Sequence, residues 1–215
     1  MTLLKRTAAP VIAGAVAIAA ATLWWRRESE RRSLPCPSQL SWLLENPFMD
    51  AVAGAEATLE RIGVRSGEHV LDVGSGPGRL AIPAARRVGP NGSVTAVDVQ
   101  SDMLARLEQR ASREGITNIE SRLLDAGVDD SLGSDRFDRA WLVTVLGEIL
   151  DKEAALRAIC RALKPGGTLS ITEVLPDPHA QRQTTGLMLA QSAGFEPAQQ
   201  WRSLFAFNQN FVKRS

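Results

Sequence analysis

"VLDVGSGPGRL", residues 70–80, decides the fold of this 215-residue chain. A short apolar run that ends in an acid leads directly into Gly74, Gly76 and Gly78. Apolar runs of this length bounded by glycine are typical of buried strands. Glycine tolerates positive φ and has no Cβ, so such a turn lets the main chain approach a ligand closely. The stretch therefore predicts a strand, a ligand-binding turn and a helix whose free N–H groups face that ligand.

Strand and helix patterns alternate from residue 50 to the end of the chain. Further strands are expected in "SVTAVDV" (93–99), "IESRLLDA" (119–126), "FDRAWLVTV" (137–145) and "TLSITEV" (168–174), with two more between 198 and 212. Strands that alternate with helices of about 10–15 residues indicate βαβ units. The pattern predicts an α/β domain over residues 50–215, with a doubly wound, mostly parallel seven-stranded sheet.

The N-terminal region has a different composition. Residues 8–25 form an uncharged run of 18 residues, which reaches the lower limit of about 17–25 for a transmembrane helix. Four arginines follow this run and two basic residues precede it, so the positive-inside bias places the domain in the cytoplasm. We expect residues 1–32 to be a single-pass membrane anchor. A cleaved signal peptide and a buried soluble helix are the alternatives.

Residues 33–49 contain three prolines and separate this run from the domain. We interpret the segment as a linker, and its apolar stretch "LSWLLE" as a possible cap over the active site.

Charge and composition exclude several functions. The net charge is +1, but residues 1–33 carry +4 and the remainder carries −3, which argues against a nucleic-acid partner. The two cysteines are far apart and there are only two histidines, so no metal-ligand pattern is present. We predict no metal site.

An acid at the end of the second strand indicates the kind of cofactor. Asp98 stands twenty residues after Gly78, where an acid binds ribose hydroxyls in doubly wound folds. A dinucleotide turn would have a third glycine where Arg79 stands, and Asp72 would repel a pyrophosphate. A nucleoside cofactor with an ammonium and a sulfonium group suits this turn better. A nicotinamide-dependent oxidoreductase remains an alternative.

The motifs together resemble one family. "VLDVGSGPG" resembles motif I of the class I S-adenosylmethionine-dependent methyltransferases, and "VTAVDVQSDML" (94–104) resembles the motif that follows it. "LLDA" (123–126), "FDRAWLVTVLGEI" (137–149) and "ICRALKPGGTLSITE" (159–173) resemble the later motifs in the same order. Within this Rossmann-like superfamily the chain looks most like the small UbiE-type methyltransferases, which act on quinone precursors and other small molecules.

This resemblance implies which residues bind S-adenosylmethionine. The residues expected to contact it are Asp72, Gly74, Ser75, Gly76, Gly78, Val143 and Thr144 at the methionine part, Asp98 at the ribose, and Val99, Met103, Asp125 and Ala126 at the adenine. Two of these have simpler explanations. Met103 could be a core residue and Asp125 could start a turn.

Methyl transfer is an in-line displacement, so the protein mainly aligns the acceptor with the methyl group. A carbon or oxygen acceptor also needs a base, and we choose Glu148 as the catalytic residue. Many relatives have a His-Glu pair here, where this chain has Gly147-Glu148. The alternative for Glu148 is an acid at a helix start. Glu173 and His179 also belong near the site, although a lone histidine in a proline-rich loop is expected to be exposed.

The methyl acceptor is expected to be a small amphiphilic or lipid-like molecule. Residues 176–182 are too few for a substrate lid after the fifth strand, which predicts an open site close to the bilayer. A methyltransferase fold kept as a non-catalytic, membrane-tethered interaction module is the alternative function.

Overall fold

The computed structural model describes residues 20, 54–129, 131–175, 177 and 179–214. The predicted anchor, apart from residue 20, and the predicted linker or cap lie outside this part of the chain, so both stay predictions. Within the part that is described, no helix is long and apolar enough to cross a membrane.

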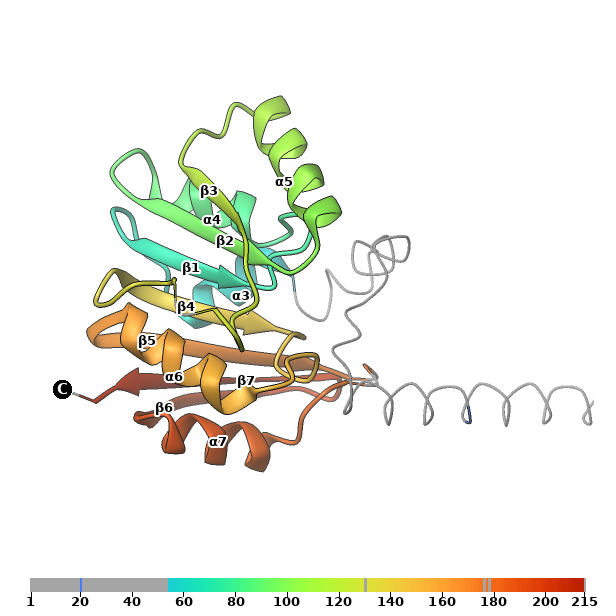
Figure 1. The fold of residues 1–215 in the computed structure, drawn as a ribbon, viewed down its shortest axis with the longest axis vertical. Helices are drawn as coiled ribbons and strands as arrows, with labels where there is room; N and C mark the ends of the chain where they lie inside the picture. Colours follow the sequence, from blue (N-terminus) through green and yellow to red (C-terminus); the bar gives the residue numbers. More distant parts are fainter. Residues whose placement is uncertain (1–19, 21–53, 130, 176, 178, 215) are drawn as a thin grey trace, which may run out of the picture.

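A seven-stranded sheet in the order β3-β2-β1-β4-β5-β7-β6 forms the centre of the domain (Figure 1). The strands are β1 His69–Val73, β2 Ser93–Asp98, β3 Ile119–Leu123, β4 Phe137–Val143, β5 Leu163–Val174, β6 Phe195–Arg202 and β7 Ala206–Lys213. Strands β1 to β5 pair in parallel, and β7 pairs antiparallel with both β5 and β6. The predicted doubly wound, mostly parallel sheet of seven strands is therefore confirmed.

Helices cover both faces of the sheet. They are α3 Ala55–Ile62, α4 Ala81–Val88, α5 Ser101–Arg113, α6 Lys152–Ala162 and α7 Gln183–Ser192. Figure 1 shows α6 and α7 on one face and α3 and α4 on the other. Each face has its own hydrophobic cluster, one built with α6 residues and one with α3 and α4 residues. Burial of both faces explains why the strands carry nearly continuous apolar runs.

One element boundary differs from the sequence prediction, which begins the fifth strand at residue 168. The sequence Lys164-Pro165-Gly166-Gly167 is typical of a turn, but it is part of β5, which begins at Leu163 opposite Phe137. Gly166 keeps a turn-like φ of 73°, and the β4–β5 register shifts between Phe137 and Arg139. An ion pair of 2.7 Å between Lys164 and Asp138 joins the two strands here. Pairing with a neighbouring strand thus overrides the local turn signal.

The parallel strands bring their carboxyl ends to one edge of the sheet, which we call the carboxyl edge. Figure 1 shows it on the side to which the β1 arrow points, away from the C-terminus of the chain. The hairpin between β6 and β7 also turns at this edge, because Ala206 pairs with Val174 at the end of β5. Every turn that the sequence analysis assigned to the cofactor lies here.

Candidate active site

The turn after β1 has the backbone that its glycines allow. Gly74, Gly76 and Gly78 have φ values of 72°, 52° and 86°, in the left-handed region that side chains disfavour. The N–H groups of Gly74 and Ser75 donate to the carbonyl of Val97 at 2.8 and 3.0 Å. These bonds attach the turn to the end of β2, so the two predicted cofactor segments form one unit.

Packing distinguishes the three glycines. A Cβ on Gly74 would lie 2.3 Å from Cγ2 of Val145, and a Cβ on Gly78 would lie 2.3 Å from Cδ1 of Leu107. A side chain at position 74 would force Val145 to move, and one at position 78 would force Leu107 to move. Around the missing Cβ of Gly76 no atom of the described residues lies within 4 Å. Gly76 therefore exposes bare main chain to open space, as close binding of a ligand requires.

Asp98 joins the first two turns of the site. Its Oδ2 accepts from the Gly76 N–H at 2.8 Å and its Oδ1 accepts from the Gln100 N–H at 2.9 Å. Burial raises the pKa of this carboxyl, and these two N–H groups act in the opposite direction. A carboxylate oxygen can accept more than one hydrogen bond. Asp98 can therefore bind ribose hydroxyls while it holds Gly76.

Asp72 is a fully buried acid directly before the glycine turn. Burial raises its pKa to about 7, while the Trp141 indole and the charge of Arg79 lower it. Its Oδ2 has no hydrogen-bond partner among the atoms that the structure describes. A buried oxygen without a partner favours a cationic ligand, because a nearby positive charge stabilises the ionised form. Asp72 thus fits the ammonium group of the expected cofactor.

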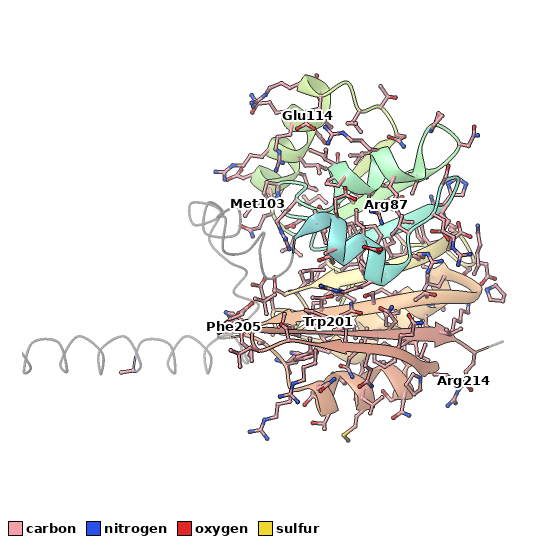
Figure 2. The ribbon with its side chains drawn as sticks, turned by 180° about the vertical axis from the view of Figure 1, so that it is seen from behind. Arg87, Met103, Glu114, Trp201, Phe205 and Arg214 are labelled. Atoms are coloured by element: carbon pink, nitrogen blue, oxygen red, sulfur yellow. The ribbon has the colours of Figure 1, made fainter. Side chains whose placement is uncertain are left out.

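The residues predicted at the adenine lie beside β2 and β3. Val99 follows β2 and is exposed, whereas Met103 is buried on α5 at the same end of the sheet as Phe205 (Figure 2). Asp125 accepts from the Gly127 N–H at 2.9 Å. Asp125 therefore starts a turn, which was the simpler explanation for this residue. Ala126 is buried next to it. Their contacts with adenine stay predictions.

Thr144 follows β4 in a strained conformation. Its φ is 58°, which is a genuine outlier for a β-branched residue. Its N–H donates to the Thr172 carbonyl at 2.8 Å, and its hydroxyl donates to the Val143 carbonyl at 2.7 Å. Strain of this kind concentrates at functional sites. It turns the chain after β4 so that Val145 packs against Gly74.

The predicted catalytic acid lies in the turn after β4. Glu148 is half-buried and precedes α6, which begins at Lys152 with Asp151 as its N-cap. The Asp151 carboxylate accepts from the Ala154 N–H at 2.8 Å, so Asp151 is the acid at the helix start. That alternative for Glu148 is therefore wrong, and its catalytic role stays a prediction.

Glu173 interacts electrostatically with Glu148, and His179 contacts the neighbouring Gly147. Burial raises the pKa of Glu173 well above its usual range, and the charges of Asp177 and Glu148 raise it further. The Oε1 of Glu173 has no hydrogen-bond partner in the described part of the chain. His179 was expected to be exposed but is buried. Its N–H donates to Oδ1 of Asp177 at 2.7 Å, which fixes the loop after β5.

Contact with Gly147 explains the burial of His179. A Cβ on Gly147 would lie 1.9 Å from the His179 carbonyl oxygen and 3.0 Å from the His179 Cβ. The loops after β4 and β5 therefore touch, and only glycine fits at position 147. The side-chain amide of Gln181 also donates to the His179 carbonyl at 2.9 Å.

Sequence reasoning missed residues that support the site from a distance in the chain. Trp141 lies opposite Asp72 in the β1–β4 register, and Val145 fills the space beside Gly74. Arg110 on α5 donates to the Pro77 carbonyl at 3.0 Å and so holds the glycine turn from outside. No sequence signal marks Val145, because the positive φ of Thr144 before it is seen only in the structure. The β1–β4 register places Trp141 opposite Asp72, and no local sequence pattern reveals that register.

The chain belongs to the methyltransferase-domain family, whose model matches residues 64–209. This match confirms the predicted family. The cofactor-fitting turns described above lie within the matched residues.

Two curated relatives are ubiquinone/menaquinone biosynthesis C-methyltransferases UbiE. The one from Pseudomonas putida (strain F1) is 39% identical over 117 residues, which cover 54% of this chain and 45% of the relative. The one from Chromobacterium violaceum is 36% identical over 120 residues, with 54% and 47% covered. The chain therefore spans less than half the length of these relatives.

Solved structures share the fold. A SAM-dependent methyltransferase from Aquifex aeolicus superposes with a TM-score of 0.76 at 20% identity, covering 82% of this chain and 98% of its own. An arsenic(III) S-adenosylmethionine methyltransferase from Chlamydomonas reinhardtii gives a TM-score of 0.60 at 21% identity, with 71% and 65% covered. Together with the family match, these neighbours support S-adenosylmethionine as the cofactor.

Proposed function

We propose that this protein transfers a methyl group from S-adenosylmethionine to a small amphiphilic, quinone-like or lipid-like acceptor at the cytoplasmic surface of a membrane. Residues 1–32 would hold the domain there. The UbiE relatives, which are named for C-methylation in quinone biosynthesis, support the acceptor class. One observation carries the proposal: Oδ2 of buried Asp72, which has no hydrogen-bond partner among the described residues, lies directly before a bare glycine turn that Asp98 holds.

The residues of the chain would hold each part of the cofactor. Asp72 binds the ammonium group, Gly76 leaves room for the methionine part, and Asp98 accepts from the ribose hydroxyls. When bound, S-adenosylmethionine supplies a methyl group on a sulfonium, which is already an activated leaving group. The protein therefore contributes alignment and exclusion of water rather than activation of the donor.

Proton transfer from the acceptor falls to the loops after β4 and β5. Glu148 is half-buried at the carboxyl edge and is our choice as general base. Glu173 is less suited to that role, because burial and the charges of Asp177 and Glu148 raise its pKa and so favour its neutral form. The neutral form of Glu173 would offer a hydrogen-bond donor to the acceptor, and the contact of the buried His179 with Gly147 joins the two loops.

Methyl transfer is tested with a membrane extract and S-adenosylmethionine that carries a radiolabelled methyl group. Label in an extractable amphiphile, identified by mass spectrometry, supports the proposal. Calorimetry on the intact chain then tests S-adenosylmethionine, its demethylated product and a nicotinamide dinucleotide. Bound cofactor without labelled product in broad extracts would favour the non-catalytic interaction module. Binding of the nicotinamide alone would favour an oxidoreductase.

A further inference from the structure

Exposed apolar side chains concentrate at the carboxyl edge. Among the described residues, eight large hydrophobic side chains are exposed: Val99, Leu123, Val128, Leu150, Leu175, Met188, Leu204 and Phe205. Seven of these belong to strand ends or loops at the carboxyl edge, and the exception is Met188 on α7. Single exposed apolar residues need no explanation, but a collection at one edge does.

Part of this collection lies away from the cofactor turns. Leu175, Leu204 and Phe205 come from the loop after β5 and the β6–β7 hairpin, and we call these three residues the apolar tip. Leu204 is 80% exposed, Leu175 46% and Phe205 43%. Strands β5, β7 and β6 lie on the far side of β4 from β1, β2 and β3, which carry the cofactor turns. The expected cofactor therefore does not cover the apolar tip.

The apolar tip has a defined shape. The Leu175 N–H donates to the Phe205 carbonyl at 2.6 Å, and the Ser203 N–H donates to the Ala206 carbonyl at 2.7 Å. The first bond joins the loop after β5 to the hairpin, and the second closes the hairpin turn. Figure 2 shows Phe205 at the end of the sheet opposite Arg214. The tip is thus a fixed projection of the edge.

Exposed basic residues stand close to the apolar tip in the sequence. Arg202 ends β6 next to the hairpin turn, Arg182 precedes α7, and both are exposed. Beneath them, the guanidinium of Arg61 lies 3.5 Å from the centre of the Trp201 ring, which stabilises the base of the hairpin. Apolar side chains bordered by arginine match the interface of a bilayer with anionic headgroups.

Helix α3, with which the described domain begins, starts toward the same edge of the sheet. The carbonyl of Ile62, at the end of α3, accepts from Arg139 near the start of β4, so α3 ends at the amino edge of the sheet. Helix α3 therefore runs from the carboxyl edge toward the amino edge. Gly54, which precedes α3, therefore lies toward the carboxyl edge, and the uncharged run 8–25 stands earlier in the sequence.

We propose that the apolar tip docks into the headgroup region of an anionic bilayer, so that the mouth of the site faces the lipid. This inference rests on the membrane attachment contained in the proposed function. An acceptor dissolved in the bilayer would then reach the site without crossing water. The expectation that residues 176–182 are too few for a lid agrees with this arrangement.

A fluorophore at the tip tests the docking. The full chain with Cys36→Ser and Cys160→Ser carries either Leu204→Cys or, as the matched control, Met188→Cys, which is 69% exposed. Each cysteine is labelled with an environment-sensitive dye on vesicles of phosphatidylethanolamine and phosphatidylglycerol. We expect a blue-shifted emission and quenching by lipids with spin-labelled chains at position 204, and neither effect at position 188. Calorimetry with S-adenosylmethionine on the same samples reports folding.

Three results would overturn the docking. Equal signals at positions 204 and 188 on vesicle-bound protein would show that the tip does not insert. A blue shift at 204 without lipid quenching would show that protein covers it, either residues 33–49 or a second copy of the chain. Failure of the chain to float with vesicles would remove both the docking and the membrane attachment. Methyl transfer, tested separately with S-adenosylmethionine, would be unaffected by any of them.

Discussion

Replacement of Asp72 by asparagine is expected to stabilise the protein more strongly as the pH rises. The pKa of this buried carboxyl is about 7 in the folded protein, against an ordinary value of 3.8. The stability that protonation supplies is fully present below the ordinary value and is lost as the pH rises toward 7. With 1.36 kcal/mol for each pKa unit, the whole loss is about 4 kcal/mol. Between pH 5 and pH 8 the wild type loses about 3 kcal/mol of unfolding free energy through this carboxyl. The asparagine variant does not lose it, because asparagine does not titrate.

Urea unfolding of the wild type and of Asp72→Asn at pH 5 and pH 8 measures this difference. All other titrating groups are shared, so they cancel between the two proteins. By thermal unfolding, a change of 3 kcal/mol corresponds to a relative shift of about 6–12 °C for a domain of this size. Asp102→Asn, on the exposed face of α5, controls for the loss of one aspartate. If wild type and Asp72→Asn changed in parallel between the two pH values, the assignment of a raised pKa would be refuted.

The same variant is expected to lose cofactor affinity. If the ammonium group binds ionised Asp72, the affinity of the wild type for S-adenosylmethionine increases up to about pH 7, the pKa of the carboxyl. The affinity of Asp72→Asn lacks this increase. Calorimetry across pH 5–8 measures both curves. Equal affinities at pH 8 would show that Asp72 does not contact the cofactor.

Three further predictions follow from the geometry. Gly74→Ala is expected to lower the unfolding free energy more than Gly67→Ala. Both positions have positive φ, but only a side chain at position 74 would meet Val145. Equal losses in urea unfolding would contradict the packing argument. Asp98→Asn is expected to weaken S-adenosylmethionine binding about 10- to 150-fold in calorimetry, from the 1.5–3 kcal/mol of a charged hydrogen bond; an unchanged dissociation constant would exclude the ribose role. Glu173→Gln resembles the protonated acid, so its stability relative to wild type should increase as the pH rises; a pH-independent difference in urea unfolding would show that Glu173 is ionised in the fold.

The order of strands and helices was predictable because each element has a local signal. Alternating apolar segments of strand and helix length dictate βαβ units, and right-handed crossovers leave few possible arrangements. The cofactor turns were predictable for the same reason. Glycine with positive φ at 74, 76 and 78 and an acid at the end of β2 are local features of the chain.

Features that depend on contacts across the sheet were not predictable. Trp141 reaches Asp72 only through the β1–β4 register, and Gly147 requires glycine only because His179 lies against it. The start of β5 at Leu163 was missed for the same reason, since strand pairing overrode a strong turn sequence. In each case the partner lies tens of residues away. A single sequence contains no pattern that links such positions.

The charge of the site distinguishes the two kinds of cofactor more clearly than the glycine spacing does. Asp72, Asp98 and Glu173 are all buried at or near the carboxyl ends of their strands, and burial raises the pKa of each. A diphosphate would bring further negative charge into this environment and raise the cost of ionising the acids. A ligand with an ammonium and a sulfonium group lowers that cost. The free energy that the ionised acids cost the folded protein is then recovered when the ligand binds. The buried acids are therefore a reason to expect a cationic cofactor, independent of the family match.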